Sequence, residues 1–96
     1  MLHRRQKSPW AMANDIAQEI SRRGFPAEAR QVTVRSAIED AQRPAIVIPG
    51  RGVALINSEL DIVVASSNKP LPRAPIFEYK NAEVVAENIL RNLPLP

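Results

Sequence analysis

The chain is short, mildly basic and free of cysteine, and these properties restrict both its fold and its chemistry. Ninety-six residues, 45% of them hydrophobic and only four of them aromatic, allow one small core built from aliphatic side chains. The lack of cysteine excludes disulfides, thiolate metal sites and a cysteine nucleophile. The single histidine, His3, argues against a Ser-His-Asp triad and against a multi-histidine zinc site.

Positive charge is concentrated in the first half of the chain. Residues 1–51 carry nine Lys or Arg against five Asp or Glu, whereas residues 52–96 carry four against five. The formal net charge of +3 permits nucleic-acid binding without requiring it. No stretch approaches the roughly 18 apolar residues of a membrane span, and the basic start leads into no apolar signal core. We therefore expect a cytoplasmic protein with no membrane partner.

The first predicted element is a helix over residues 9–23, preceded by a flexible basic arm at residues 1–8. Ser8 is a favourable N-cap and Pro9 suits the first helical position. Gly24 offers a left-handed end, with Phe25 placed to fold back on the helix. Apolar residues recur at helical spacing at Trp10, Ala13, Ile16, Ala17 and Ile20.

The middle of the chain predicts consecutive strands. We expect a turn over residues 25–30, and from Gln31 the apolar period changes to two. Residues 39–44 are predicted to be a connection. The apolar runs at 45–48 and 53–57 then flank Pro49-Gly50-Arg51-Gly52 and predict a hairpin, and a third apolar run follows at 60–65.

The last third predicts a loop, a strand and a helix. Residues 66–73 hold Pro70 and Pro72, which are typical of an extended loop, and an apolar strand is expected at 75–80. Asn81 then caps a helix whose apolar stripe is Ala82, Val85, Ala86, Ile89 and Leu93, and a Pro-rich tail follows at 94–96.

This order of elements predicts the α+β class. We expect a mainly antiparallel sheet of four to five short strands, with an N-terminal and a C-terminal helix packed on one face, in a single domain over residues 9–93. The side chains predicted to form the core share the apolar phase of these elements: Ile16, Ile20, Val34, Ile46, Val47, Leu55, Ile62, Val64, Ile76, Val85 and Ile89.

One group of charged residues suggests catalysis. Asp61 begins one predicted strand, and Glu78 and Lys80 fall on one face near the end of another. PD-(D/E)xK nucleases use two such acids to hold Mg²⁺ and a lysine to position the attacking water. A solvated strand face with a same-face charge pair is the favoured interpretation, and the nuclease site is the alternative. Asp61 and Glu78 are therefore candidate metal ligands, and Mg²⁺ a candidate cofactor, only if the protein is a nuclease.

Other residues suggest binding. Arg4, Arg5 and Lys7 of the arm could each neutralise about one phosphate of a nucleic acid. Gly50-Arg51-Gly52 could form a backbone nest for a phosphate, but no helix follows it and a plain hairpin turn is the favoured interpretation. Trp10 is expected in the core, with an anchoring role at an interface as the alternative.

From these features we expect a small non-enzymatic protein-interaction or assembly subunit without a cofactor, a phage or mobile-element component being one form of it. Its partner is expected to be a protein or another copy of the chain. The first alternative is a Mg²⁺-dependent nuclease that uses Asp61, Glu78 and Lys80. The second is a nucleic-acid-binding accessory protein acting through the arm and Arg51.

Overall fold

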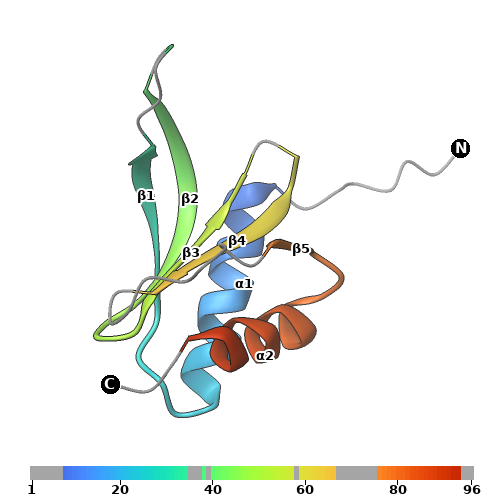
Figure 1. Ribbon diagram of the computed structural model, residues 1–96. Helices are drawn as coiled ribbons and strands as arrows, with labels where there is room; N and C mark the ends of the chain where they lie inside the picture. Colours follow the sequence, from blue (N-terminus) through green and yellow to red (C-terminus); the bar gives the residue numbers. More distant parts are fainter. Residues whose placement is uncertain (1–7, 35–37, 39, 58, 67–75, 94–96) are drawn as a thin grey trace, which may run out of the picture.

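The computed structural model describes residues 8–34, 38, 40–57, 59–66 and 76–93, which form two helices and one five-stranded sheet (Figure 1). The elements in chain order are α1 (Pro9–Arg22), β1 (Glu28–Val34), β2 (Ala41–Ile48), β3 (Gly52–Ile56), β4 (Asp61–Ser66), β5 (Ile76–Glu78) and α2 (Ala82–Asn92).

Both helices begin and end where their capping residues predict. Ser8 Oγ accepts a hydrogen bond of 3.1 Å from the Ala11 amide, and Asn81 Oδ1 accepts one of 2.8 Å from the Val84 amide. At the end of α1, Gly24 has a φ of +93°, and the Phe25 amide donates to the Ile20 carbonyl over 3.3 Å. This left-handed ending turns the chain so that Phe25 packs on the core, as expected.

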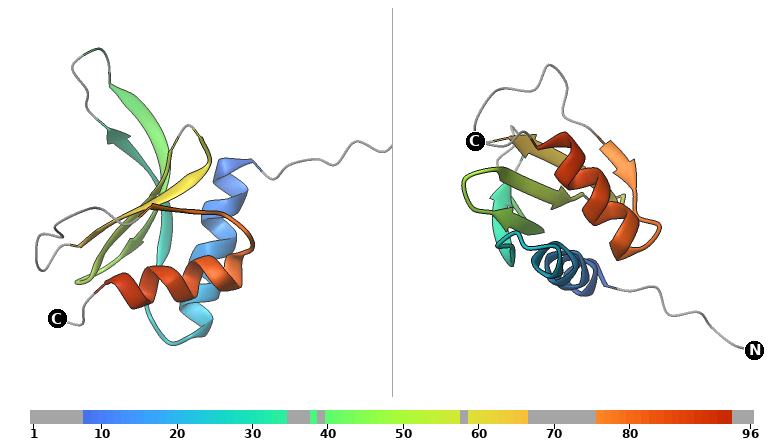
Figure 2. Two further views of the ribbon diagram at one scale, coloured as in Figure 1. Left: turned by 45° about the vertical axis from the view of Figure 1, so that its right-hand side comes forward. Right: turned by 90° about the horizontal axis from the view of Figure 1, so that it is seen from below.

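The sheet is an antiparallel meander in which neighbours in sequence are neighbours in space. Its strand order is β1-β2-β3-β4-β5, and each strand pairs with the next in antiparallel orientation. Side chains from α1, α2 and the inner face of the sheet form one buried cluster, so both helices lie on the same face (Figures 1 and 2). The predicted α+β architecture is confirmed.

The turn between β3 and β4 is held by one side chain. Asn57 Oδ1 accepts hydrogen bonds from the amides of Glu59 (2.9 Å) and Asp61 (3.0 Å), and the Leu60 amide donates to the Asn57 carbonyl over 3.0 Å. Leu60 has a φ of +66°, a conformation that L-residues rarely adopt, and its side chain packs against the core. This turn fixes the position of Asp61 at the start of β4.

Two strands are longer than predicted. Residues 28–30, expected in a turn, and residues 41–44, expected in a connection, pair with the opposite strand of the β1–β2 hairpin. Pro44 lies within this segment, and proline removes a hydrogen-bond donor from a strand. It is tolerated because the β2–β3 register begins only at Ala45, so at Pro44 strand β2 is paired on one side alone. Strand β5 is shorter than predicted and ends at Glu78.

The predicted core is correct for the helices and for Ile46, Ile62 and Val64, but not for every strand residue. Val34 is 37% exposed, and Ile76 is 61% exposed. Val47 and Leu55 are half-buried outside the core cluster, and Ala54 and Ile56 take the inward positions of β3 instead. The prediction failed here because β2, β3 and β4 are apolar on both faces, so alternation alone does not indicate which face is covered.

Candidate protein-interaction surface

The face of the sheet opposite the helices is rich in aliphatic side chains. Side chains alternate along a strand, so the neighbours of the buried Ile46, Ile56 and Ile62 point away from α1 and α2. Within the described ranges, no helix or strand packs on this side (Figure 2). We call it the uncovered face, and its large aliphatic residues are Val32, Val34, Val47, Val53, Leu55, Val63 and Ile76.

The strand register arranges these side chains in rows that cross the sheet. The central row places Leu55 of β3 between Ala45 and Val63 on the neighbouring strands. Arg30 and Ile76 end this row on the two edge strands. Ala45 has no exposed surface although it lies on the uncovered face. Its small side chain is enclosed by larger neighbours, so the row dips beside Leu55.

A hollow of about 280 Å³ lies on this face next to Leu55. Its lining is mostly apolar and comes from β1 to β4: Val34, Arg43, Leu55, Ile56, Asn57 and Val63. The hollow is large enough for one or two aliphatic side chains of another molecule, since a buried leucine occupies less volume than this. The uncovered face therefore has relief into which a partner can pack.

A second row, next to the central one, carries charge of both signs. Arg43 lies opposite Val32 on β1, and Asp61 lies opposite Glu78 on β5. Continuing the β2–β3 register by two residues places Asn57 between Arg43 and Asp61 in this row. The row is thus basic on β2 and acidic on β4 and β5. Among the described residues, none of the three charged side chains has an ion-pair partner.

The structure brings together two of the three candidate catalytic residues. Asp61 and Glu78 are direct cross-strand partners, and such partners have Cα atoms about 4.5 to 5.5 Å apart. Lys80 lies beyond the end of β5 in a bend, is exposed, and makes no ion pair with either carboxylate. The predicted same-face placement of Glu78 and Lys80 assumed a strand to residue 80, and β5 ends too early for that.

The two facing carboxylates carry like charges and repel each other. Like charges directly opposite each other on paired strands destabilise a sheet, and no described cation relieves this pair. Two carboxylates can accept hydrogen bonds from a guanidinium or supply oxygen ligands to a divalent cation. In the described part of the chain, no group of three or more acidic or histidine side chains is placed to hold a metal ion.

Arg51 is buried and joins the hairpin to α2. Its Nη2 donates to the carbonyl oxygens of Leu93 (2.7 Å) and Leu90 (3.4 Å), and its guanidinium lies 4.7 Å from the centre of the Phe25 ring. Only 7% of the residue is exposed. A cation on the last carbonyls of a helix stabilises that end. The geometry thus gives Arg51 a structural role, and its guanidinium is not presented to a nucleic acid.

The remaining predicted binding residues have mixed outcomes. Trp10 is 41% exposed on the first turn of α1, so its expected place in the core is wrong. Its role as an interface anchor stays a prediction. Arg4, Arg5 and Lys7 lie outside the described residues, and nucleic-acid binding through them also stays a prediction.

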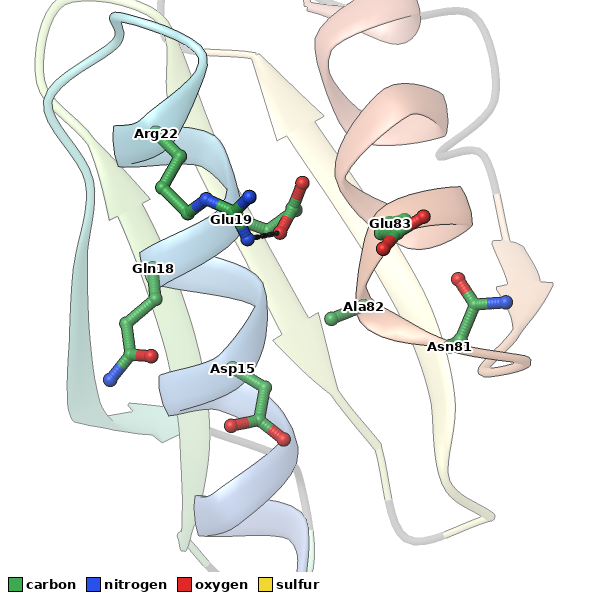
Figure 3. Close-up of a pocket in the computed structure, with 7 residues that line it drawn as sticks. All are labelled: Asp15, Gln18, Glu19, Arg22, Asn81, Ala82 and Glu83. Atoms are coloured by element: carbon green, nitrogen blue, oxygen red, sulfur yellow. Dashed lines mark hydrogen bonds and ion pairs between the residues drawn. The ribbon is translucent and has the colours of Figure 1, made fainter.

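A second hollow, of about 510 Å³, opens between α1 and the start of α2 (Figure 3). Glu19 is its central charge, and its carboxylate pairs with Arg22 at 3.1 Å and with Arg23 at 3.6 Å. Arg23 also donates to the Glu83 carbonyl over 3.3 Å. The hydrogen bond from Arg23 ties the end of α1 to the start of α2, and the two arginines neutralise the Glu19 charge, so this hollow lies at a helix junction.

The uncovered face was missed from the sequence, although a signal for it existed. The runs AIVI at 45–48, VALI at 53–56 and IVVA at 62–65 are apolar without alternation. Continuous apolar strands are typical of sheets buried on both faces. Two helices cover only one face, so the runs indicated that an apolar face would be left without a helix on it.

Comparisons with known proteins identify no relative: no family model, no curated protein and no solved structure matches the chain. In the part of the chain that the structure describes, neither helix has the length and apolar character needed to cross a membrane.

Proposed function

We propose that this protein is a non-enzymatic interaction or assembly subunit of the cytoplasm that acts through the uncovered face of its sheet. The observation that carries the proposal is the row of Leu55, Val63 and Ile76, which continues the apolar character of the core onto a face that no described element covers. Contiguous aliphatic patches with a polar rim are typical of protein-interaction sites.

The energetics favour a partner on this face. Completing the burial of a half-exposed aliphatic side chain contributes on the order of 1 kcal/mol. Across the whole uncovered face this gives several kcal/mol before the entropic cost of association. The charged row beside it adds specificity, because Arg43 and the Asp61–Glu78 pair require complementary groups on the partner.

The proposal is tested by a charge placed in the centre of the face. Leu55→Lys introduces an ammonium group into the apolar row, and we expect the chain in native extract to shift from a larger assembly to its 10.7 kDa monomer in size-exclusion chromatography. Glu87→Lys, on the exposed side of α2, is the matched control and leaves the assembly unchanged. If wild-type chain already elutes as the monomer in extract, the proposal is wrong.

A second candidate function is a metal-dependent nuclease, and one observation favours it: Asp61 and Glu78 face each other across β4 and β5. The position of Lys80 outside β5 weakens it. Cleavage of DNA or RNA that requires Mg²⁺ and is lost in Asp61→Ala would support this function. Under the leading proposal, purified wild-type chain has no such activity.

A further inference from the structure

We infer that the partner on the uncovered face is a second copy of this chain, packed sheet to sheet about a twofold axis parallel to β3. This inference rests on the proposed function, because it names the occupant of the same face. A self-complementary surface is what a twofold dimer requires, since each patch meets its own copy. The strand register shows which residues of the two copies would meet, so their complementarity can be checked pair by pair.

A twofold axis parallel to β3 places the strands of the second copy in reverse order over those of the first. Each row of one copy then lies over the same row of the other. Strand β4 of one copy then lies over β2 of the other, and β5 lies over β1. In the central row, Leu55 meets its own copy at the axis, and Val63 lies over the small Ala45 of the second copy. The hollow beside Leu55 supplies the space for these side chains. Face-to-face sheets remain aligned to within about 30°, so rows near the axis stay matched.

The same axis pairs opposite charges in the second row. Arg43 of each copy lies over Asp61 of the other, with Glu78 on the neighbouring strand. The interface would thus give a guanidinium to each Asp61–Glu78 pair, and a carboxylate to each Arg43. All three side chains lack an ion-pair partner among the described residues of the single chain. Two copies together pair the Arg43 and Asp61 charges, which the described residues of one copy leave without an opposite charge.

The alternative face-to-face dimer, with its axis perpendicular to the strands, is disfavoured by the same charges. An axis through the central row exchanges the rows on its two sides. Asp61 would then lie over Ala65, and Arg43 over Val47, so neither of these charges would meet an opposite charge. The axis parallel to β3 leaves only charges of the edge strands over aliphatic side chains, Arg30 over Ile76 and Glu78 over Val32. Burial of an unpaired charge is costly. Charge complementarity therefore selects the axis parallel to β3.

The size of the face is sufficient for a weak dimer. Five strands spaced about 4.8 Å apart, with about five residues of about 3.3 Å each, give a flat area of about 400 Å² per copy. The relief of the side chains raises the accessible area, so two faces bury on the order of 1,000 Å², the lower limit for a specific interface. We expect a dimer that dissociates on dilution.

Charge reversal in separate chains tests the pairing directly. Arg43→Asp places two carboxylates over Asp61 and its copy, and Asp61→Arg places two guanidinium groups over Arg43 and its copy. Sedimentation equilibrium should show each variant alone with a dimer Kd raised at least about tenfold. An equimolar mixture of the two variants should recover dimers near the wild-type Kd, because both contacts of the mixed dimer then join opposite charges. A contact within one chain cannot be restored by mixing.

The matched control is Arg91→Asp, which makes the same change of charge on the exposed side of α2 and should leave the Kd unchanged. Thermal melts establish that each variant is folded. The inference is overturned if wild-type chain stays monomeric at the highest attainable concentration, if the single reversals dimerise like wild type, or if the mixture fails to recover dimers.

Failure of this inference is distinguishable from failure of the proposed function. If the purified chain is monomeric but Leu55→Lys still dissociates a larger assembly in extract, the uncovered face binds a different protein and only the second copy is wrong. If neither purified nor extracted chain associates, both are wrong.

Discussion

Both faces of the sheet carry rows of aliphatic side chains, yet the helices cover only one of them. In β4 the neighbours Val63 and Val64 are the same residue type, and Val64 has no exposed surface while Val63 remains half-buried. The helices complete the burial of one face, and no described helix or strand covers the other. The composition of a strand alone therefore does not distinguish residues that pack within the fold from residues that would pack against a partner, because burial of apolar surface drives both.

The largest expected effect lies on the covered side. Ile20→Ala in α1 removes a fully buried side chain at the helix–sheet contact, and we expect it to lower the free energy of unfolding by about 2 to 4 kcal/mol. Denaturant melts measure this directly. A loss below about 0.5 kcal/mol would mean that α1 does not pack on the sheet as described.

The next effect concerns the contact that joins α2 to the hairpin. Arg51→Ala removes the hydrogen bonds to Leu93 and Leu90 and the contact with Phe25, and we expect a loss of about 2 kcal/mol. Arg51→Met keeps much of the buried volume and should cost less, about 1 kcal/mol, because Nε and Nη1 of Arg51 have no hydrogen-bond partner in the described structure. Equal stability of Arg51→Ala and wild type would contradict a structural role.

Two single substitutions in β4 compare the stability contributions of the two faces directly. Val64→Ala and Val63→Ala delete the same two methyl groups from adjacent residues that point to opposite faces. In dilute protein we expect Val64→Ala to cost about 1.5 to 2.5 kcal/mol and Val63→Ala about 0.5 kcal/mol. At high protein concentration the cost of Val63→Ala should rise, since the dimer then contributes to stability. Equal costs at low concentration would remove the distinction between the faces.

The smallest expected effect separates folding from assembly. Asp61→Asn removes one of two facing carboxylates, and we expect a gain of about 0.2 to 0.5 kcal/mol in the stability of the dilute monomer. The same change should weaken the dimer, because Arg43 of the second copy loses its charged partner. We expect melts to show a more stable monomer and sedimentation to show a weaker dimer. A loss in monomer stability would contradict the repulsion between Asp61 and Glu78.

The helices and the fold class were predictable from local signals. Ser8, Gly24 and Asn81 are capping residues whose effect depends on their own backbone, so the ends of α1 and α2 follow from sequence alone. The same holds for the hairpin at Gly50, which has a φ of +77°.

The errors came from features that depend on pairing between distant residues. Pro44 lies in a strand because β3 does not reach it, and Arg51 is buried because the end of α2 lies beside the hairpin. The pairing of Asp61 with Glu78 was proposed from sequence, but the early end of β5 that separates Lys80 from them was not. Which apolar face remains uncovered also depends on where the helices pack, and no local pattern contains that information.

Coverage of the uncovered face by protein in the native extract can be measured by thiol labelling. The chain has no cysteine, so an introduced thiol is the only one in the protein. Single thiols can be introduced by Leu55→Cys on the face and by Glu87→Cys on α2 as the control, and their alkylation rates compared in native extract and in dilute purified protein. We predict that the Leu55→Cys thiol reacts at least about tenfold more slowly in extract, while the Glu87→Cys thiol reacts equally in both, because reactivity follows exposure. Equal rates for the Leu55→Cys thiol in the two conditions would contradict coverage of this face by a partner.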